Sequence, residues 1–277
     1  MFGKGYFNTA RVKYGGEIRD RQDSDPVNSS DIIGFYSADA SEDIGSIEYD
    51  QLENILGYGY DLFPNIDYEG YLYGTDNTWN SPPEANYIQF YNAFLGPYDG
   101  VYDATTVDLS SDFTISIWVY MSIDSSDPTS VPGSTLFGVG KRSEGGMIFN
   151  LDSGNKMELL VQNSFSTYLS ESSVPNLKWI YLTISKNSQQ INFYLNGSNM
   201  GVTNAAGAVA SLTDTEAALQ VARGSYTSSS HVYASSNMYF HSIELYQRIL
   251  PNSEIRKNFL LRNAWLQGES YDQAFWV

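Results

Sequence analysis

The amino-acid sequence predicts an all-β fold, an antiparallel sandwich of strands. Of the 277 residues, 42% are apolar, and they include 22 Tyr and 14 Phe. Aromatic and β-branched residues of this kind favour strands. Several short segments alternate strictly between apolar and polar side chains, which is typical of half-buried strands, and only one segment near the C-terminus has helical periodicity.

The first part of the chain predicts little regular structure. Residues 1–30 are Gly-rich and polar, so we expect an extended N-terminal arm with little core of its own. We expect the sandwich to occupy residues 31–265 and a C-terminal tail to follow over 266–277. Within the sandwich, residues 31–90 have aromatic side chains separated by Gly, Asn and Asp, which predicts short strands and long loops.

From residue 88 onward, the strand pattern becomes clear. Three segments place apolar residues at every second position, namely Phe113, Ile115, Ile117, Val119 and Met121 in the first, Met157, Leu159 and Val161 in the second, and Ile180, Leu182 and Ile184 in the third. Since side chains alternate between the two faces of a strand, each set should face the core.

A hairpin follows at Asn196-Gly197. This dipeptide fits a two-residue type I′ turn, in which both central residues need a positive φ. A turn at this point pairs Leu195 with Ser198, Phe193 with Met200, and Ile191 with Val202. The apolar residues of both strands then share one face, so the turn and the hydrophobic register agree.

The one predicted helix follows the segment LPNSE. Ile255 and Phe259 lie one helical turn apart. Asn252 or Ser253 would cap the helix, with Pro251 near its first turn.

The order of these segments resembles a known family. DFTISIWVYM is similar to the FTISAWV strand of laminin-G-like, concanavalin-A-like jelly rolls, and NLKWIYLTISKNSQQINFYLNG is similar to their hairpin, with Trp179 in place. MYFHSIELYQRILPNSEI resembles the closing segment, although His241 replaces its usual Gly and Pro251 replaces its capping Ser. The resemblance extends over residues 31–265. It implies a concanavalin-A-like jelly-roll β-sandwich with a short C-terminal helix, a fold shared by lectins, adhesion modules, hydrolases and viral attachment proteins.

The distribution of charge excludes one class of function. The net charge is −17, and residues 22–140 contain no Lys or Arg against 20 acidic residues. Such a field repels nucleic acid, so we expect no nucleic-acid partner. It is compatible with bound Ca²⁺, the one cofactor we consider, although the sequence identifies no metal ligands.

The sequence also lacks the features of cysteine chemistry, of a membrane span and of a signal peptide. There is no Cys, which excludes disulfides and thiolate chemistry. No apolar run is long enough to span a membrane, and the sequence starts without the apolar core of a signal peptide.

One acidic motif, EYDQLE, resembles the catalytic motif of jelly-roll β-glucanases. Those enzymes retain configuration with two carboxylates about 5–5.5 Å apart on a strand. Here Glu48 and Glu53 lie between segments that read as loop, well before the strand at 112–121, so we expect a solvated acidic loop or part of a cation site. His241 is expected in the core and His231 in a polar loop, and no nucleophile–base set exists. We therefore predict no catalytic residues and no enzyme.

Two loops contain residues suited to sugar binding, which uses aromatic faces and planar polar groups. The candidates for glycan binding are Tyr98, Asp99, Tyr102, Tyr226 and Tyr233. These tyrosines could instead pack at the edge of the sandwich or against a neighbouring subunit.

Both ends of the sequence suggest assembly. Lys4, Arg11 and Lys13 belong to a segment, residues 1–21, with five basic and two acidic side chains, and Phe275 and Trp276 form an apolar end. We therefore predict a homo-oligomer that contacts other virion proteins and host glycan, a structural or attachment protein of a bacteriophage located in the virion. The alternative is a cellular or secreted protein that binds carbohydrate or cleaves β-glucan, located outside the cell.

Overall fold

The chain is described here by a computed structural model. It defines residues 11–14, 17–20, 32–37, 63–64, 71–75, 86–91, 95–96, 106–121, 135–140, 145–161, 166–175, 178–188, 190–202, 212–215, 217–221 and 236–266.

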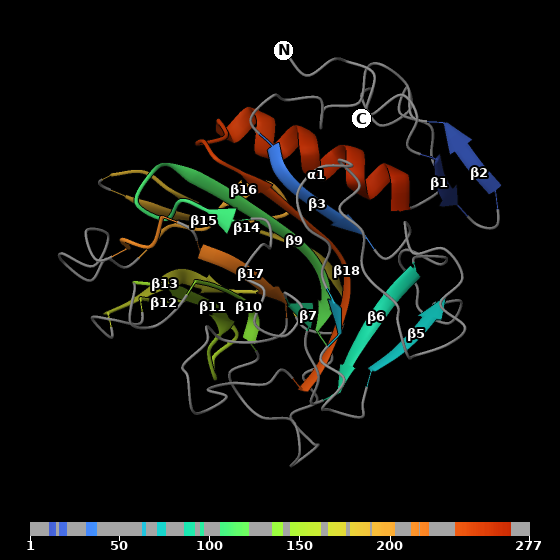
Figure 1. Cartoon of the computed structure of the whole chain (residues 1–277), viewed down its shortest axis with the longest axis horizontal. Coiled ribbons are helices and arrows are strands. Elements are labelled where there is room, and N and C mark those ends of the chain that lie inside the picture. The colour runs from blue at the N-terminus through green and yellow to red at the C-terminus, as the bar shows by residue number, and fades with distance from the viewer. Residues whose placement is uncertain are drawn as a thin grey trace.

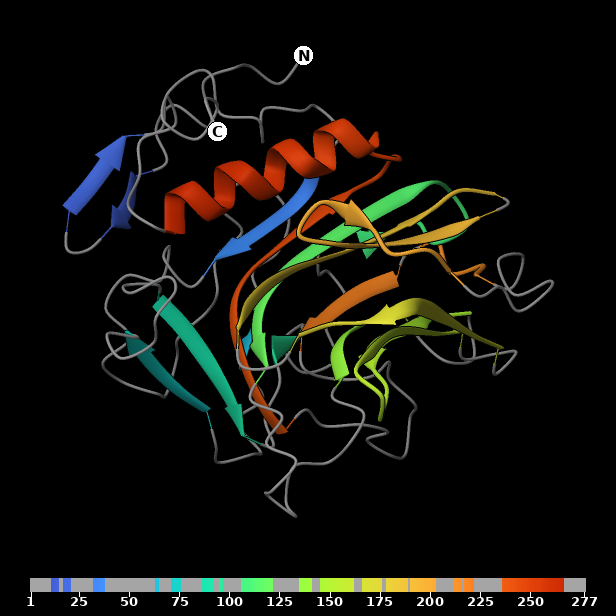
Figure 2. The ribbon, with the colours of Figure 1, turned by 180° about the vertical axis from the view of Figure 1, so that it is seen from behind.

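The described residues form two packed antiparallel sheets with one helix against the outside of the first (Figure 1). We call the first sheet the helix-covered sheet and the second the opposite sheet. Seen from behind, the order is again helix, helix-covered sheet, opposite sheet (Figure 2). This confirms the predicted antiparallel β-sandwich with a C-terminal helix.

Within the described residues, each sheet has eight strands. The helix-covered sheet has, in spatial order, β16 (Ser198–Asn199), β15 (Ile191–Leu195), β14 (Trp179–Lys186), β9 (Phe113–Met121), β18 (Ser236–Tyr246), β6 (Asn86–Tyr91) and β5 (Tyr71–Thr75), with β3 (Ile32–Ser37) also paired to β18. The opposite sheet has β13 (Ser166–Ser173), β12 (Lys156–Val161), β11 (Met147–Leu151), β10 (Thr135–Val139), β17 (Ala217–Val221), β7 (Leu95–Gly96) and β4 (Phe63–Pro64), with β8 (Thr106–Val107) paired to β17.

A separate hairpin lies in the segment predicted to be an extended arm. Its strands β1 (Arg11–Tyr14) and β2 (Glu17–Asp20) pair only with each other in the described part of the chain. The predicted division into arm, sandwich and tail stays a prediction.

The core lies between the two sheets, where the predicted alternation places it. Ile117 of β9 lies opposite Leu182 of β14 and opposite Ile243 of β18. Phe149 of β11 lies opposite Leu159 of β12 on the other sheet. These residues are fully buried in one apolar cluster, and burial of each such side chain contributes about 1.5–3 kcal/mol.

The predicted hairpin is confirmed. Asn196 and Gly197 have φ values of 50° and 75°, and Leu195 lies opposite Ser198. The turn also fixes the next layer, because a Cβ on Gly197 would lie 2.7 Å from the Cα of Arg256 in the helix. The turn and the helix can approach this closely only because residue 197 is glycine.

The helix α1 (Asn252–Leu266) begins where expected and is longer than expected, at 15 residues. The carbonyl of Pro251 accepts hydrogen bonds from the amides of Glu254 (2.9 Å) and Ile255 (3.0 Å), which closes the first turn. Asn252, one of the two predicted caps, accepts a hydrogen bond from Tyr194 OH (2.8 Å) on the sheet instead. The ring of Phe259 stacks on that of Trp118, with 5.8 Å between the ring centroids, and so packs the helix against β9.

A buried lysine closes the loop that leads into β9. Lys186 at the end of β14 is 2% exposed. Its Nζ donates to the carbonyls of Leu109 (2.9 Å), Ser110 (3.0 Å) and Ser111 (3.0 Å). Burial lowers the pKa of Lys186, while the negative charges of Asp112 and Asp108 act in the opposite direction.

Candidate functional site

The face of the opposite sheet that points away from the core has an unusual composition, and we call it the distal face. Thr135 lies opposite Asn150, and Asn150 lies opposite Glu158. In the adjacent row, Gln220 lies opposite Gly138. Because cross-strand partners share a face, these residues lie together. The described residues of the distal face are Thr135, Gly138, Ile148, Asn150, Lys156, Glu158, Leu160, Thr167, Leu169, Ala218 and Gln220.

Three polar side chains of the distal face are buried and incompletely hydrogen-bonded. Thr135, Asn150 and Gln220 are 0%, 6% and 7% exposed. Among the described residues, Thr135 Oγ1, Asn150 Oδ1 and Gln220 Oε1 have no hydrogen-bond partner. A buried polar group left in this state costs about 1–3 kcal/mol, and such groups in a native structure call for an explanation.

The free oxygen of Asn150 is held in place by its other amide atom. Asn150 Nδ2 donates to Glu158 Oε2 at 3.2 Å. An amide whose nitrogen faces a carboxylate must turn its oxygen elsewhere, so Asn150 offers an acceptor. The carboxylate of Glu158 adds a second acceptor group on the next strand.

The charges near these acceptors are few. Lys156 lies two residues before Glu158 on the same face, beside the β11–β12 turn. That turn is organised by Asp152, whose Oδ1 accepts from the amides of Gly154 and Lys156, both at 2.8 Å. The described distal face thus contains one carboxylate and one ammonium around neutral acceptors, on an aliphatic floor that includes Ile148 and Leu160.

This arrangement suits a neutral polar ligand. Amides, a hydroxyl and a carboxylate on a rigid sheet are groups that fix the orientation of a hydroxyl-rich molecule. The described residues contain no group of three or more His, Asp or Glu side chains placed to hold a metal ion. Nothing in this part of the chain therefore assigns the Ca²⁺ that the acidic sequence allows.

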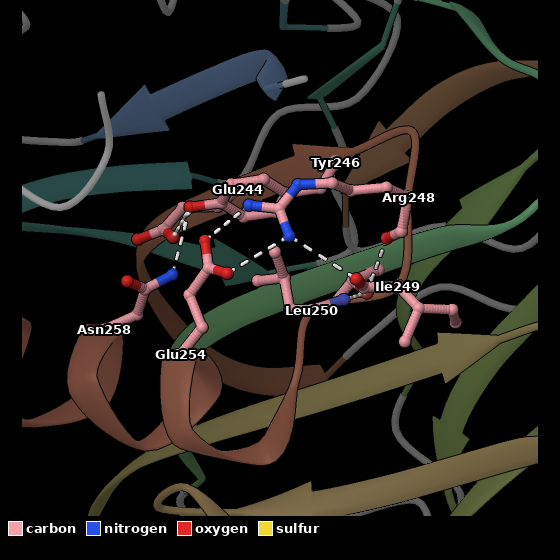
Figure 3. Close-up of polar contacts among 8 residues, drawn as sticks. Glu244, Tyr246, Arg248, Ile249, Leu250, Glu254 and Asn258 are labelled. Carbon is pink, nitrogen blue, oxygen red and sulfur yellow. Dashed lines mark hydrogen bonds and ion pairs between the residues drawn. The ribbon is translucent and has the colours of Figure 1, made fainter. Parts of the chain in front are cut away.

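A second polar cluster lies under helix α1. Arg262 Nε donates to Glu244 Oε1 at 2.6 Å, Tyr246 OH donates to Glu244 Oε2 at 2.9 Å, and Asn258 Nδ2 donates to Tyr246 OH at 3.1 Å. Figure 3 shows Glu244 and Tyr246 of the strand meeting Asn258 of the helix. Tyr181 OH also reaches Glu244 Oε2, at 3.4 Å.

Helix α1 covers this cluster, and Glu244 accepts hydrogen bonds through both of its carboxylate oxygens. Glu244 and Arg262 have side chains that are 1% and 5% exposed. Burial, followed by the charge of Glu244, raises the pKa values of Tyr181 and Tyr246 well above 10.0, so both phenols are neutral. A carboxylate beside phenols resembles acid–base machinery, but here the helix covers it. We conclude that the cluster fastens the helix to the sheet.

A neighbouring ion pair fastens the start of the helix. Arg248 Nη1 donates to Glu254 Oε2 at 3.1 Å, and its other terminal nitrogen pairs with Glu254 Oε1 (Figure 3). Thr114 Oγ1 of β9 donates to the carbonyl of Arg248 and accepts from the amide of Leu250 (3.0 Å). These two hydrogen bonds hold the segment between β18 and α1 against β9.

The residues predicted from the sequence to bind glycan are not tested by this structure. Tyr98, Asp99, Tyr102, Tyr226 and Tyr233 all lie outside the described residues. So do Glu48, Glu53 and His231, and the assembly candidates Lys4, Phe275 and Trp276. Their roles stay predictions.

Three other predicted residues are placed. Arg11 and Lys13 lie in β1, opposite Asp20 and Ile18 of β2, and their role in assembly stays a prediction. His241 lies in β18, fully buried, with its ring 6.2 Å from that of Trp179, so its predicted place in the core is confirmed.

Sequence reasoning missed the distal face. The signal was present in two short strands, because Asn150 interrupts the apolar run MIFNL and Gln220 interrupts AALQV. A polar residue inside a fully buried strand indicates either an internal partner or a ligand. The sugar-binding residues predicted from the sequence all lie in two aromatic loops instead.

Comparisons with solved structures show proteins of the same fold. The sialidase of Trypanosoma rangeli, solved with 2,3-difluorosialic acid, matches with a TM-score of 0.54 and 16% identity over 96% of this chain and 37% of its own. Domain 4 of AbnA, a GH43 extracellular arabinanase from Geobacillus stearothermophilus solved with arabinotriose, matches with a TM-score of 0.55 and 15% identity over 82% of this chain and 97% of its own. The binding domain of botulinum neurotoxin serotype G matches with a TM-score of 0.50 and 12% identity over 83% of this chain and 51% of its own. No curated protein sequence matches the chain.

These matches correct one prediction. The prediction that the protein is not an enzyme is wrong, because its fold is shared with a sialidase and with an arabinanase domain. The missing catalytic motif therefore does not separate this chain from enzymes. The chain spans 37% of the length of the sialidase. The location in a virion stays a prediction.

The fold-level predictions are confirmed. The two sheets have the carbohydrate-binding and glycosidase-like jelly-roll form, and no described helix has the length and apolar character needed to cross a membrane. A family model described as the concanavalin A-like lectin/glucanases superfamily matches residues 96–256, which is more than half of the sequence. The chain therefore belongs to the concanavalin A-like lectin/glucanase superfamily.

Proposed function

We propose that this chain binds carbohydrate through its distal face, within a protein that acts on glycans outside the cell. The observation that supports this proposal is the set of buried oxygens without partners on Thr135, Asn150 and Gln220. Sugar hydroxyls would donate to these acceptors and remove the cost of leaving them unpaired. The neighbouring aliphatic side chains of Ile148 and Leu160 suit the C–H faces of a sugar ring.

The comparisons support a role in carbohydrate processing. The AbnA domain, which aligns over 97% of its length, was solved with arabinotriose. The sialidase is much longer than the aligned region, so this chain corresponds to one part of such an enzyme. We therefore propose that sugar binding by this chain serves the cleavage of a glycan, as the alternative prediction from the sequence has it.

The test is a titration of the chain with arabinotriose and with cellotriose, monitored by isothermal titration calorimetry. The release of reducing ends is measured on the same samples. Each lost hydrogen bond to a ligand costs about 1 kcal/mol, so Asn150→Ala and Gln220→Ala should each weaken binding about fivefold.

Matched controls are available elsewhere in the described chain. Asn192→Ala changes a half-buried Asn on the outer side of β15, and Gln190→Ala changes an exposed Gln before that strand. Both should bind as the wild type does. The proposal fails if neither trisaccharide binds at millimolar concentration, or if the distal-face variants bind as tightly as the controls.

A further inference from the structure

We infer that the distal face is selective for neutral carbohydrates and discriminates against sugars that have a carboxylate. This inference rests on the proposed function and adds the class of ligand. The predicted ligand class differs from that of the much longer sialidase, whose solved complex contains a derivative of sialic acid, an acidic sugar.

The first argument is the type of atom left without a partner. Asn150 Oδ1 and Gln220 Oε1 are carbonyl oxygens, which only accept hydrogen bonds. They need donors, and the hydroxyl groups of a neutral sugar are donors. A carboxylate has no hydrogen-bond donor at neutral pH, so its oxygens would face the carbonyl oxygens of Asn150 and Gln220 without forming a hydrogen bond.

The second argument is the position of Glu158. Its Oε2 lies 3.2 Å from the Asn150 amide nitrogen, so this negative charge is directly adjacent to one of the free acceptors. The described distal face offers no arginine to form a bidentate pair with a ligand carboxylate. Its one cation, Lys156, lies at the end of the strand, beside the turn held by Asp152.

The third argument is the charge of the whole chain. A net charge of −17 disfavours the approach of any anion. Long-range repulsion and the local arrangement of acceptors therefore act in the same direction.

The test compares neutral and acidic ligands of similar size on the full chain at about 150 mM salt, where long-range repulsion is partly screened. The pairs are cellotriose with trigalacturonic acid, and lactose with 3′-sialyllactose. We expect the neutral member of each pair to bind at least about tenfold more tightly, because like charges brought together at a binding surface are strongly unfavourable.

The variant Glu158→Gln tests the local cause. Glutamine keeps an oxygen that can accept from Asn150 Nδ2 but loses the charged acceptor of the distal face, so binding of neutral sugars should weaken by up to about fivefold. Binding of the acidic sugars should improve about fivefold or more, because the adjacent negative charge is gone. The matched control, Asp112→Asn, makes the same change of net charge at an exposed residue before β9 and should leave the preference unchanged.

The outcomes separate the two proposals. If acidic sugars bind as tightly as neutral ones or more tightly, or if Glu158→Gln leaves the preference unaltered, the inference is overturned while carbohydrate binding stands. If no sugar of either class binds, the proposed function itself is overturned, and the inference with it.

Discussion

The ion pair beneath helix α1 leads to a quantitative prediction about stability. Replacing Arg262 with Met leaves the carboxylate of Glu244 buried, and its remaining donors in the described part of the chain are the hydroxyls of Tyr246 and Tyr181, at 2.9 Å and 3.4 Å. Removing one partner of a buried ion pair costs about 3–5 kcal/mol, because the remaining charge cannot be hydrated. Arg262 also lies over the ring of Phe35, at 4.3 Å, and that contact disappears as well.

Urea unfolding followed by tryptophan fluorescence measures this cost. With a denaturant slope of about 3 kcal/mol per molar urea, Arg262→Met should lower the unfolding midpoint by about 1–1.7 M. The double variant Glu244→Gln, Arg262→Met removes both charges and should recover part of the loss, since no uncompensated charge then remains. Arg256→Met is the matched control, because Arg256 is exposed on the same helix, and it should stay within about 0.5 kcal/mol of the wild type.

Two results would refute this reasoning. One is a loss of less than about 1 kcal/mol for Arg262→Met, which would mean that water reaches the pair. The other is a double variant that is as unstable as the sum of the two single variants, because the two side chains would then act independently.

Two further predictions concern buried groups elsewhere in the sandwich. Lys186→Met leaves the three carbonyls of Leu109, Ser110 and Ser111 without their shared donor, so we expect a loss of about 2–4 kcal/mol in thermal or urea unfolding. Lys178→Met, at an exposed lysine, should have almost no effect, and equal effects would contradict the role given to Lys186. Tyr246 has a pKa raised above 10.0 in the folded state, so its contribution to stability is complete below pH 10.0 and is lost as the pH rises further, while the unfolded tyrosine ionises. Tyr246→Phe should therefore be less stable than the wild type at neutral pH. The urea unfolding midpoints of the two proteins should converge above pH 10.0. A difference between the midpoints that stays constant up to about pH 11 would contradict this assignment.

The sequence by itself determined the sandwich between residues 112 and 260. Period-two alternation in β9, β12 and β14 identified which side chains enter the core, because a strand has only two faces. The Asn196-Gly197 turn fixed the register of its hairpin, since a two-residue turn with two positive φ values allows one pairing. These features are local, and local geometry is encoded within a few residues.

Only the tertiary structure decided which polar residues belong together. Asn150 and Gln220 belong to strands far apart in sequence, and the order β11–β10–β17 brings them to one face. Likewise, Glu244 and Arg262 meet because the helix folds back over β18. Strand order and helix docking are set by how all apolar faces pack at once, so no short stretch of sequence specifies them.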